Sequence, residues 1–134
     1  MVFSAAAKNN GVEALEYLNR LWKNVDMDDY YITIRGTTFT EFLDDEWDMV
    51  SIIGVIVDNT DTSGSSGILY IKVTDGGYVY TNARFIAVAW QNKANDNIEF
   101  ATGNYEKATL AEIKTTYGEI ADFNEDSFYP YKKR

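Results

Sequence analysis

Residues 67–85 read GILYIKVTDGGYVYTNARF, in which two extended runs flank the turn sequence Thr74-Asp75-Gly76-Gly77. Isoleucine, valine and tyrosine favour strands, and an Asp-Gly pair favours a tight hairpin turn. Because side chains two positions apart share one face of a strand, the pattern predicts a hairpin with one apolar and one polar-aromatic face. The residues expected on the polar-aromatic face are Tyr70, Lys72, Tyr78, Tyr80 and Arg84.

Further elements are expected on both sides of this hairpin. Residues 49–57, MVSIIGVIV, are rich in β-branched side chains and predict a buried strand with Gly54 at a bulge. Alanines in the segment FIAVAWQNKA weaken the case for a strand and favour a short helix there. The remaining expectations are a flexible loop at 58–67, the helix at 85–94, and a last strand pair at 108–116 and 119–123.

The N-terminal part has a different pattern. Apolar residues at helical spacing predict an amphipathic helix over 11–24, and alternation predicts a strand over 30–36. In that strand Tyr31 and Arg35 share a side, so they are added to the candidate binding residues. The acidic segment 40–48 is expected to form a short helix or a loop.

This order of elements predicts a mainly β (α+β) fold, an OB-fold-like five-stranded barrel with a helix between its third and fourth strands. The expected organisation is a single domain with three parts: an N-terminal helix and strand extension at 1–48, the barrel at 49–124 and a C-terminal tail at 125–134. A mixed sheet without barrel closure is the alternative, because strand pairing cannot be read from one sequence.

The amino-acid composition limits the kinds of catalytic and metal site that the chain can contain. The chain of 134 residues contains no cysteine and no histidine, which excludes thiol nucleophiles, disulfides, histidine bases and zinc sites of the usual ligand type. The longest apolar runs fall short of the roughly 20 residues that a membrane helix needs, and no signal peptide is visible. We therefore expect a cytoplasmic protein without a membrane partner, in the host cytoplasm if the protein is viral.

The formal net charge of −9 argues against a protein that grips duplex DNA by neutralising many phosphates. Exposed bases of single strands stack on aromatic rings at about 1–3 kcal/mol each, and stacking depends less on net charge. A tyrosine face with Lys72 and Arg84 therefore suits single-stranded DNA. The competing interpretation is that these tyrosines are ordinary strand residues.

The strand ILYIKV, the TDGG turn and the step Tyr80-Thr81 leading through Arg84 into FIAVAW resemble the small single-stranded DNA-binding proteins of bacteriophages. The resemblance implies a non-enzymatic protein that coats displaced strands in replication or recombination, without a cofactor or metal. It also implies replication proteins as partners and allows a homo-oligomer. The chain departs from many such proteins by ending in Lys132-Lys133-Arg134 and not in an acidic tip.

The many carboxylates of the chain raise the question of a metal site, a catalytic acid pair or a mimic of DNA. The acids around 26–29 and 44–48 do not follow the spacing of an EF-hand, and the carboxylate pairs Glu41 with Asp45 and Glu112 with Glu119 have no fixed separation. An acidic DNA-mimic that inhibits a host nucleic-acid-binding defence protein remains an alternative, motivated by the acids at 41–48. A small phage structural or assembly protein is another.

Overall fold

The computed structural model describes residues 16–44, 49–61 and 65–134, which form eight strands and a few short helices. The strands are β1 (Leu21–Asn24), β2 (Tyr30–Arg35), β3 (Thr38–Asp44), β4 (Met49–Asp61), β5 (Ser66–Asp75), β6 (Phe85–Ala94), β7 (Asn97–Thr102) and β8 (Tyr129–Lys133). The helices are η1 (Glu16–Leu18), α2 (Leu110–Thr116), η2 (Ile120–Asp122) and η3 (Glu125–Ser127).

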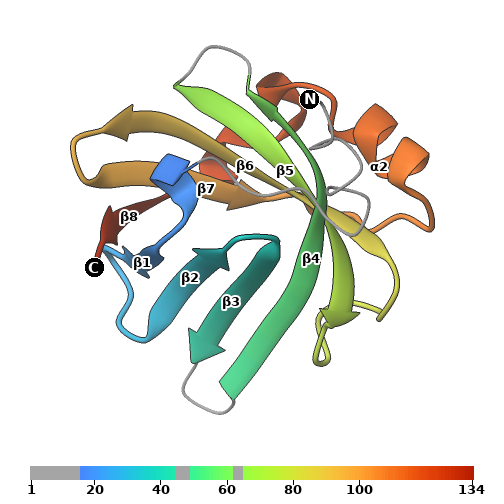
Figure 1. The fold of residues 1–134 in the computed structure, drawn as a ribbon, viewed down its shortest axis with the longest axis horizontal. Helices are drawn as coiled ribbons and strands as arrows, with labels where there is room; N and C mark the ends of the chain where they lie inside the picture. Colours follow the sequence, from blue (N-terminus) through green and yellow to red (C-terminus); the bar gives the residue numbers. More distant parts are fainter. Residues whose placement is uncertain (1–15, 45–48, 62–64) are drawn as a thin grey trace, which may run out of the picture.

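All eight strands belong to one closed antiparallel barrel in which each strand pairs with its neighbours in the sequence (Figure 1). Closure comes from β1 and β8, whose register places Trp22 opposite Lys133 and Asn24 opposite Tyr131. Because the barrel is closed, every strand pairs with a neighbour on both sides and no strand forms an edge.

Alternation along the strands directs one set of side chains into the barrel. Its core is a cluster of buried residues that includes Trp22, Phe39 and Trp90. One end of the barrel is closed by η1, where the Tyr17 hydroxyl donates to the carbonyls of Asn95 and Asn97, both at 3.2 Å. The apolar side chains of this cluster thus pack the half of the barrel next to η1.

A second apolar cluster lies outside the barrel, where α2 packs against β5 and β6 (Figure 1). Ile113 of α2 is fully buried, and Ala87, Ala89 and Ala101 form part of the strand surface below it. The Tyr70 hydroxyl donates to the Tyr117 carbonyl at 2.6 Å. Both faces of β5 are therefore buried, which explains its uninterrupted apolar run.

The mainly β prediction is confirmed, but the barrel has eight strands and not the five of an OB-like arrangement. β1, β2 and β3 lie in the segment expected to be an extension, and β8 lies in the segment expected to be a tail. All four are barrel strands. The strand at 30–36 and the strand at 49–57 are confirmed, with a bulge between Ile53 and Gly54 as expected.

Several element predictions are wrong. Residues 40–44, expected to form a helix or a loop, belong to β3. Residues 58–61 of the predicted loop belong to β4, and the predicted strand at 119–123 contains the short helix η2. Residues 11–15 of the predicted N-terminal helix lie outside the described residues.

Residues 85–94 form a strand, because the alanines that weakened the β interpretation are the small side chains over which α2 packs. Residues 110–116 form a helix, whose signal was a Thr109 cap followed three residues later by Glu112. In the predicted helix 11–24, η1 ends at Leu18 and residues 21–24 pair with β2 and β8, so tertiary pairing overrides local helical spacing.

The opening hairpin differs from its prediction in length. The turn at Asp75 and Gly76 exists, with the Gly77 amide donating to Asp75 Oδ1 at 3.1 Å, but it begins a loop that lasts until Arg84. Gly76 fits only without a side chain, because a Cβ there would lie 2.1 Å from the Tyr80 carbonyl oxygen. Tyr78, Tyr80 and Arg84 therefore do not lie on a strand. Residues 45–48 of the acidic segment and residues 62–64 of the predicted loop lie outside the described residues.

Among the helices in the described ranges, none is both long enough and apolar enough to span a membrane.

Candidate functional site

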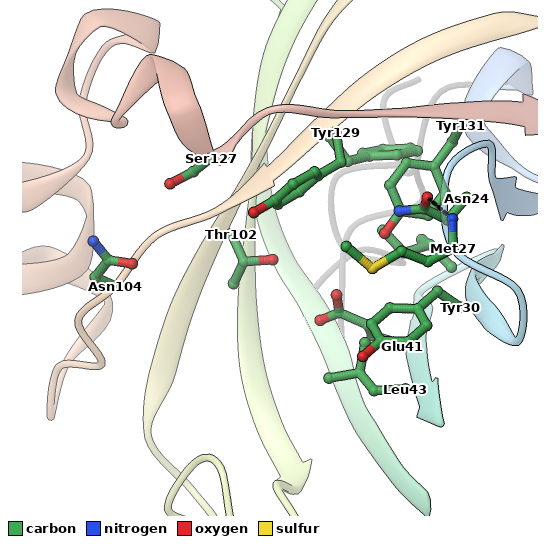
Figure 2. Close-up of a pocket in the computed structure, with 12 residues that line it drawn as sticks. Asn24, Met27, Tyr30, Glu41, Leu43, Thr102, Asn104, Ser127, Tyr129 and Tyr131 are labelled. Carbon is green, nitrogen blue, oxygen red and sulfur yellow. Dashed lines mark hydrogen bonds between the residues drawn. The ribbon is translucent and has the colours of Figure 1, made fainter. Parts of the chain in front are cut away.

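The barrel contains a cavity of about 330 Å³ at the end opposite η1, which we call the open end (Figure 2). Strands β1 and β2, β5 and β6, and β7 and β8 are connected at this end. The cavity is lined by Asn24, Met27, Tyr30, Ile32, Glu41, Leu43, Phe100, Thr102, Asn104, Ser127, Tyr129 and Tyr131. The interior is thus divided into an apolar, packed half and a hollow half that carries polar groups.

Strand alternation places these polar groups. Phe39 belongs to the barrel core, so Glu41 and Leu43, two and four residues further along β3, face the same interior. On β2 the same phase directs Tyr30 inward beside them, since Tyr30 pairs with Leu43. Figure 2 shows the Glu41 carboxyl group in the cavity next to the Tyr30 ring.

Glu41 is the ionisable acid of this cavity. Its cross-strand neighbours are Ile32 on β2 and Ile52 on β4, both 1% exposed. No hydrogen bond or ion pair reaches its carboxyl group from the described residues. Burial raises the pKa of Glu41 from 4.5 to about 7, since the charged form lacks the solvation it has in water. A carboxyl group with such a pKa inside a cavity is a typical mark of a functional site.

Hydroxyl groups surround the acid. Burial, followed by the nearby Glu41 charge, raises the pKa of both Tyr80 and Tyr131, so both stay neutral donors at physiological pH. A side-chain hydrogen bond with Asn24 acts against this increase at Tyr131. Asn24 is 1% exposed, and its Oδ1 accepts from the amides of Asp26 and Met27, both at 2.9 Å. This Asn therefore fixes both the turn after β1 and one wall of the cavity.

A second cavity of about 430 Å³ adjoins the first under the connection between β7 and β8. The two share Thr102, Asn104 and Ser127 in their walls. Its far wall includes Tyr117, whose hydroxyl accepts from the Tyr105 amide at 3.0 Å. The two cavities are therefore neighbours, one inside the barrel and the other beside the segment that contains α2 and η2.

The predicted tyrosine face is not assembled. Tyr70 is 1% exposed beneath α2, and Tyr80 packs against the barrel core from the loop at 76–84. Tyr78 is 67% exposed in the same loop. Tyr31 and Arg35 lie on the outer face of β2, where Lys23 lies over the Tyr31 ring at 5.8 Å from its centroid.

Lys72 and Arg84 instead join a different group of aromatic and basic side chains outside the barrel. Lys72 lies 6.0 Å from the Phe85 ring centroid, and Phe85 bridges to Lys107 through backbone hydrogen bonds. Lys107 in turn lies 5.7 Å from the Tyr105 ring centroid. Arg84 approaches Glu106 at 3.9 Å. We call Lys72, Arg84, Phe85, Tyr105 and Lys107 the basic-aromatic patch.

The carboxylates weighed as catalytic pairs have separate positions. Glu112 and Glu119 cap helices, Glu112 through Thr109 and Glu119 through a reciprocal pair with Asp122. Asp45 lies outside the described residues. Within residues 16–44, 49–61 and 65–134, no group of three or more acids is close enough to hold a metal ion.

Sequence reasoning missed the cavity although a signal for it was present. In the run Phe39-Thr40-Glu41-Phe42-Leu43, the acid shares the phase of Phe39 and Leu43. An acid in the apolar phase of a strand points into a core unless the strand is exposed on both faces. The other missed residues, such as Thr102 and Tyr129, lie on β7 and β8, which were not predicted as strands.

Searches of protein-family models, curated proteins and solved structures gave no match to this chain.

Proposed function

We propose that this protein binds a small organic molecule in the open end of its barrel. The observation that carries the proposal is the division of the barrel interior, with one half packed and the other hollow and lined by polar groups. An eight-stranded barrel is just wide enough either to be filled by side chains or to hold one small ligand. Apolar walls with a few convergent polar groups are typical of small-molecule sites.

The cavity suits a ligand with an apolar body and polar substituents. Met27, Leu43 and Phe100 offer apolar and aromatic surface. Glu41 and the tyrosine hydroxyls offer hydrogen-bond partners that would orient the ligand. The cavity volume lies at the lower end of the range for ligand pockets, about 300–1,000 Å³. The adjoining cavity would extend the site for a longer molecule.

The test is a ligand-observed NMR screen of a small-molecule library with two blocking variants. Thr102→Trp and Leu43→Trp place a large ring in the cavity from opposite walls of the barrel, and we expect either one to abolish binding. Ser51→Trp, on the exposed outer face of β4, is the control and should leave binding unchanged. The proposal would be contradicted if no compound binds, or if the compounds that bind do so equally well to both blocking variants.

Single-stranded DNA binding is retained as a second candidate, because the basic-aromatic patch combines rings with cations outside the barrel. Such a patch can stack bases and meet phosphates. The role expected from the sequence, protection of displaced phage strands, would then depend on Phe85 and Tyr105. Titration of intrinsic fluorescence with poly-dT, a duplex and heparin tests it: quenching by poly-dT alone that Tyr105→Ala removes would favour this candidate. A response to a basic protein partner alone would favour the acidic mimic.

A further inference from the structure

The charge balance of the open-end cavity points to the kind of ligand it takes. Glu41 is unpaired, and neither lysine nor arginine occurs among the described residues that line the cavity. A buried carboxylate without a counter-ion is unfavourable, so it either takes up a proton or awaits a cation. An anionic ligand would place a like charge beside Glu41, with no base to compensate for it.

The rings around the acid add to this preference. Tyr30, Phe100, Tyr129 and Tyr131 line the same cavity, and the Phe100 and Tyr131 rings meet edge to face at 5.4 Å between centroids. Aromatic faces carry negative potential and attract organic cations, most strongly when water is excluded. The pairing of one carboxylate with several rings is the arrangement that recognises ammonium groups.

A metal cation fits the same site less well. Calcium takes six to eight oxygen ligands and magnesium demands near-octahedral oxygen coordination. The described lining contains a single carboxylate, and its remaining oxygens belong to amides and hydroxyls of Asn24, Thr102, Asn104, Ser127 and the tyrosines. An organic cation needs only one charge partner and an apolar wall, and both are present.

On the basis of the proposed function, we propose that the ligand carries an organic ammonium group that pairs with Glu41 and lies against the tyrosine rings. The apolar body of the ligand would contact Met27 and Leu43 at the mouth of the cavity. The net charge of −9 favours binding of a cationic ligand, because an acidic protein concentrates cations near its surface.

The pH dependence follows from the groups that face Glu41. These are Tyr30 from β2, Tyr80 from the loop after β5, and Tyr129 and Tyr131 from β8, while β4 contributes the apolar Ile52. Burial raises the pKa of Tyr80 and of Tyr131, which keeps both neutral in the range used below, so Glu41 is the carboxylic acid on which the pH dependence rests. Protonation of Glu41 at the acidic end removes the charge partner of the ammonium group.

The experiment compares three probes with one aromatic body and different charges: phenethylamine, 2-phenylethanol and phenylacetate. Isothermal titration calorimetry at pH 8 should give at least about tenfold tighter binding of phenethylamine than of either other probe, from cation–π and ion-pair contributions in a desolvated site. Binding of phenethylamine should weaken at least about tenfold at pH 5.5, while 2-phenylethanol changes little. Glu41→Gln should remove the preference and its pH dependence.

The outcomes separate this inference from the proposed function. If 2-phenylethanol or phenylacetate binds as tightly as phenethylamine, and Thr102→Trp blocks it, the ammonium inference is wrong and the small-molecule site stands. If none of the three probes binds, the test uses the hits from the small-molecule library that Thr102→Trp blocks, and the charge of those hits decides whether the ammonium inference holds. Cationic hits lost in Glu41→Gln support the inference, and neutral or anionic hits overturn it. If neither Thr102→Trp nor Leu43→Trp blocks any hit, both proposals fail.

Discussion

Replacing Glu41 by glutamine should remove a loss of stability that the wild-type protein suffers as pH rises. The folded protein raises the pKa of Glu41 from 4.5 to about 7 because the carboxyl group lies in the interior cavity of the barrel, where the charged form loses solvation. At about 1.4 kcal/mol for each pH unit, the penalty for ionising it in the folded state reaches about 3 kcal/mol. Glutamine has nearly the same shape and never ionises, so it avoids this penalty.

The sign follows from proton binding. Between pH 4.5 and 7 the folded state holds the Glu41 proton that the unfolded state has lost, so stability falls as pH rises through this window. Below pH 4.5 the penalty is absent, and above pH 7 it is complete. The free energy of unfolding of Glu41→Gln minus that of the wild type should therefore increase by about 3 kcal/mol between pH 4 and pH 8.

The measurement is urea denaturation of both proteins at several pH values and constant ionic strength. Taking the difference between the two proteins cancels the titration of groups that they share and the cost of the buried amide. Glu125→Gln, at an exposed position in η3, is the control and should show a nearly constant difference. A difference for Glu41→Gln that is equally flat would refute the reasoning, because the acid would then titrate alike in both states.

Three further substitutions test the outer layer, each by urea denaturation. Tyr70→Phe removes the hydroxyl that donates to the Tyr117 carbonyl at 2.6 Å beneath α2, and should lower the free energy of unfolding by about 1–3 kcal/mol. An unchanged free energy of unfolding would contradict this, because it would mean that water replaces the lost donor. Thr109→Ala removes the hydroxyl that caps α2 by accepting from the Glu112 amide at 3.1 Å, and should lower the free energy of unfolding by about 1 kcal/mol. Thr109→Ser keeps a hydroxyl at this position and should retain most of the wild-type stability. Gly103→Ala places a Cβ 2.5 Å from the Tyr117 ring and should lower the free energy of unfolding by about 1–3 kcal/mol. An unchanged value would show that the ring moves aside without cost.

The candidate site was only partly visible in the sequence. Tyr30 lies on a strand that the sequence predicts, whereas Glu41 lies on β3, in a segment expected to form a helix or a loop. The signal for that strand is the alternation that gives Glu41 the same phase as Phe39 and Leu43. Tyr129 and Tyr131 were assigned to a tail, because a strand that contains Pro130 and lies at the chain end has a weak local signal. The opposite wall of the cavity could not be found without that strand.

Tyr70 and Tyr80 illustrate a second limit. Alternation correctly separates Tyr70 from Leu69 and Ile71, which face the barrel core. It does not tell whether the other face meets solvent or a helix, and here α2 covers it. For Tyr80, the turn signal at Asp75 and Gly76 predicted a tight hairpin turn. The loop instead continues to Arg84, and the Tyr80 ring packs against the core.

Local patterns in the sequence were enough to predict the mainly β class, a strand at 30–36 and a strand at 49–57 with a bulge at Gly54. The composition alone excludes histidine and cysteine chemistry. These features depend on local preferences and composition, which one sequence carries in full. The tertiary structure alone decided that β1 pairs with β8, about a hundred residues away, and that the barrel closes. That closure encloses the Glu41 carboxyl group with the tyrosines of β8, because the face of a strand becomes an interior only when distant strands complete the wall around it.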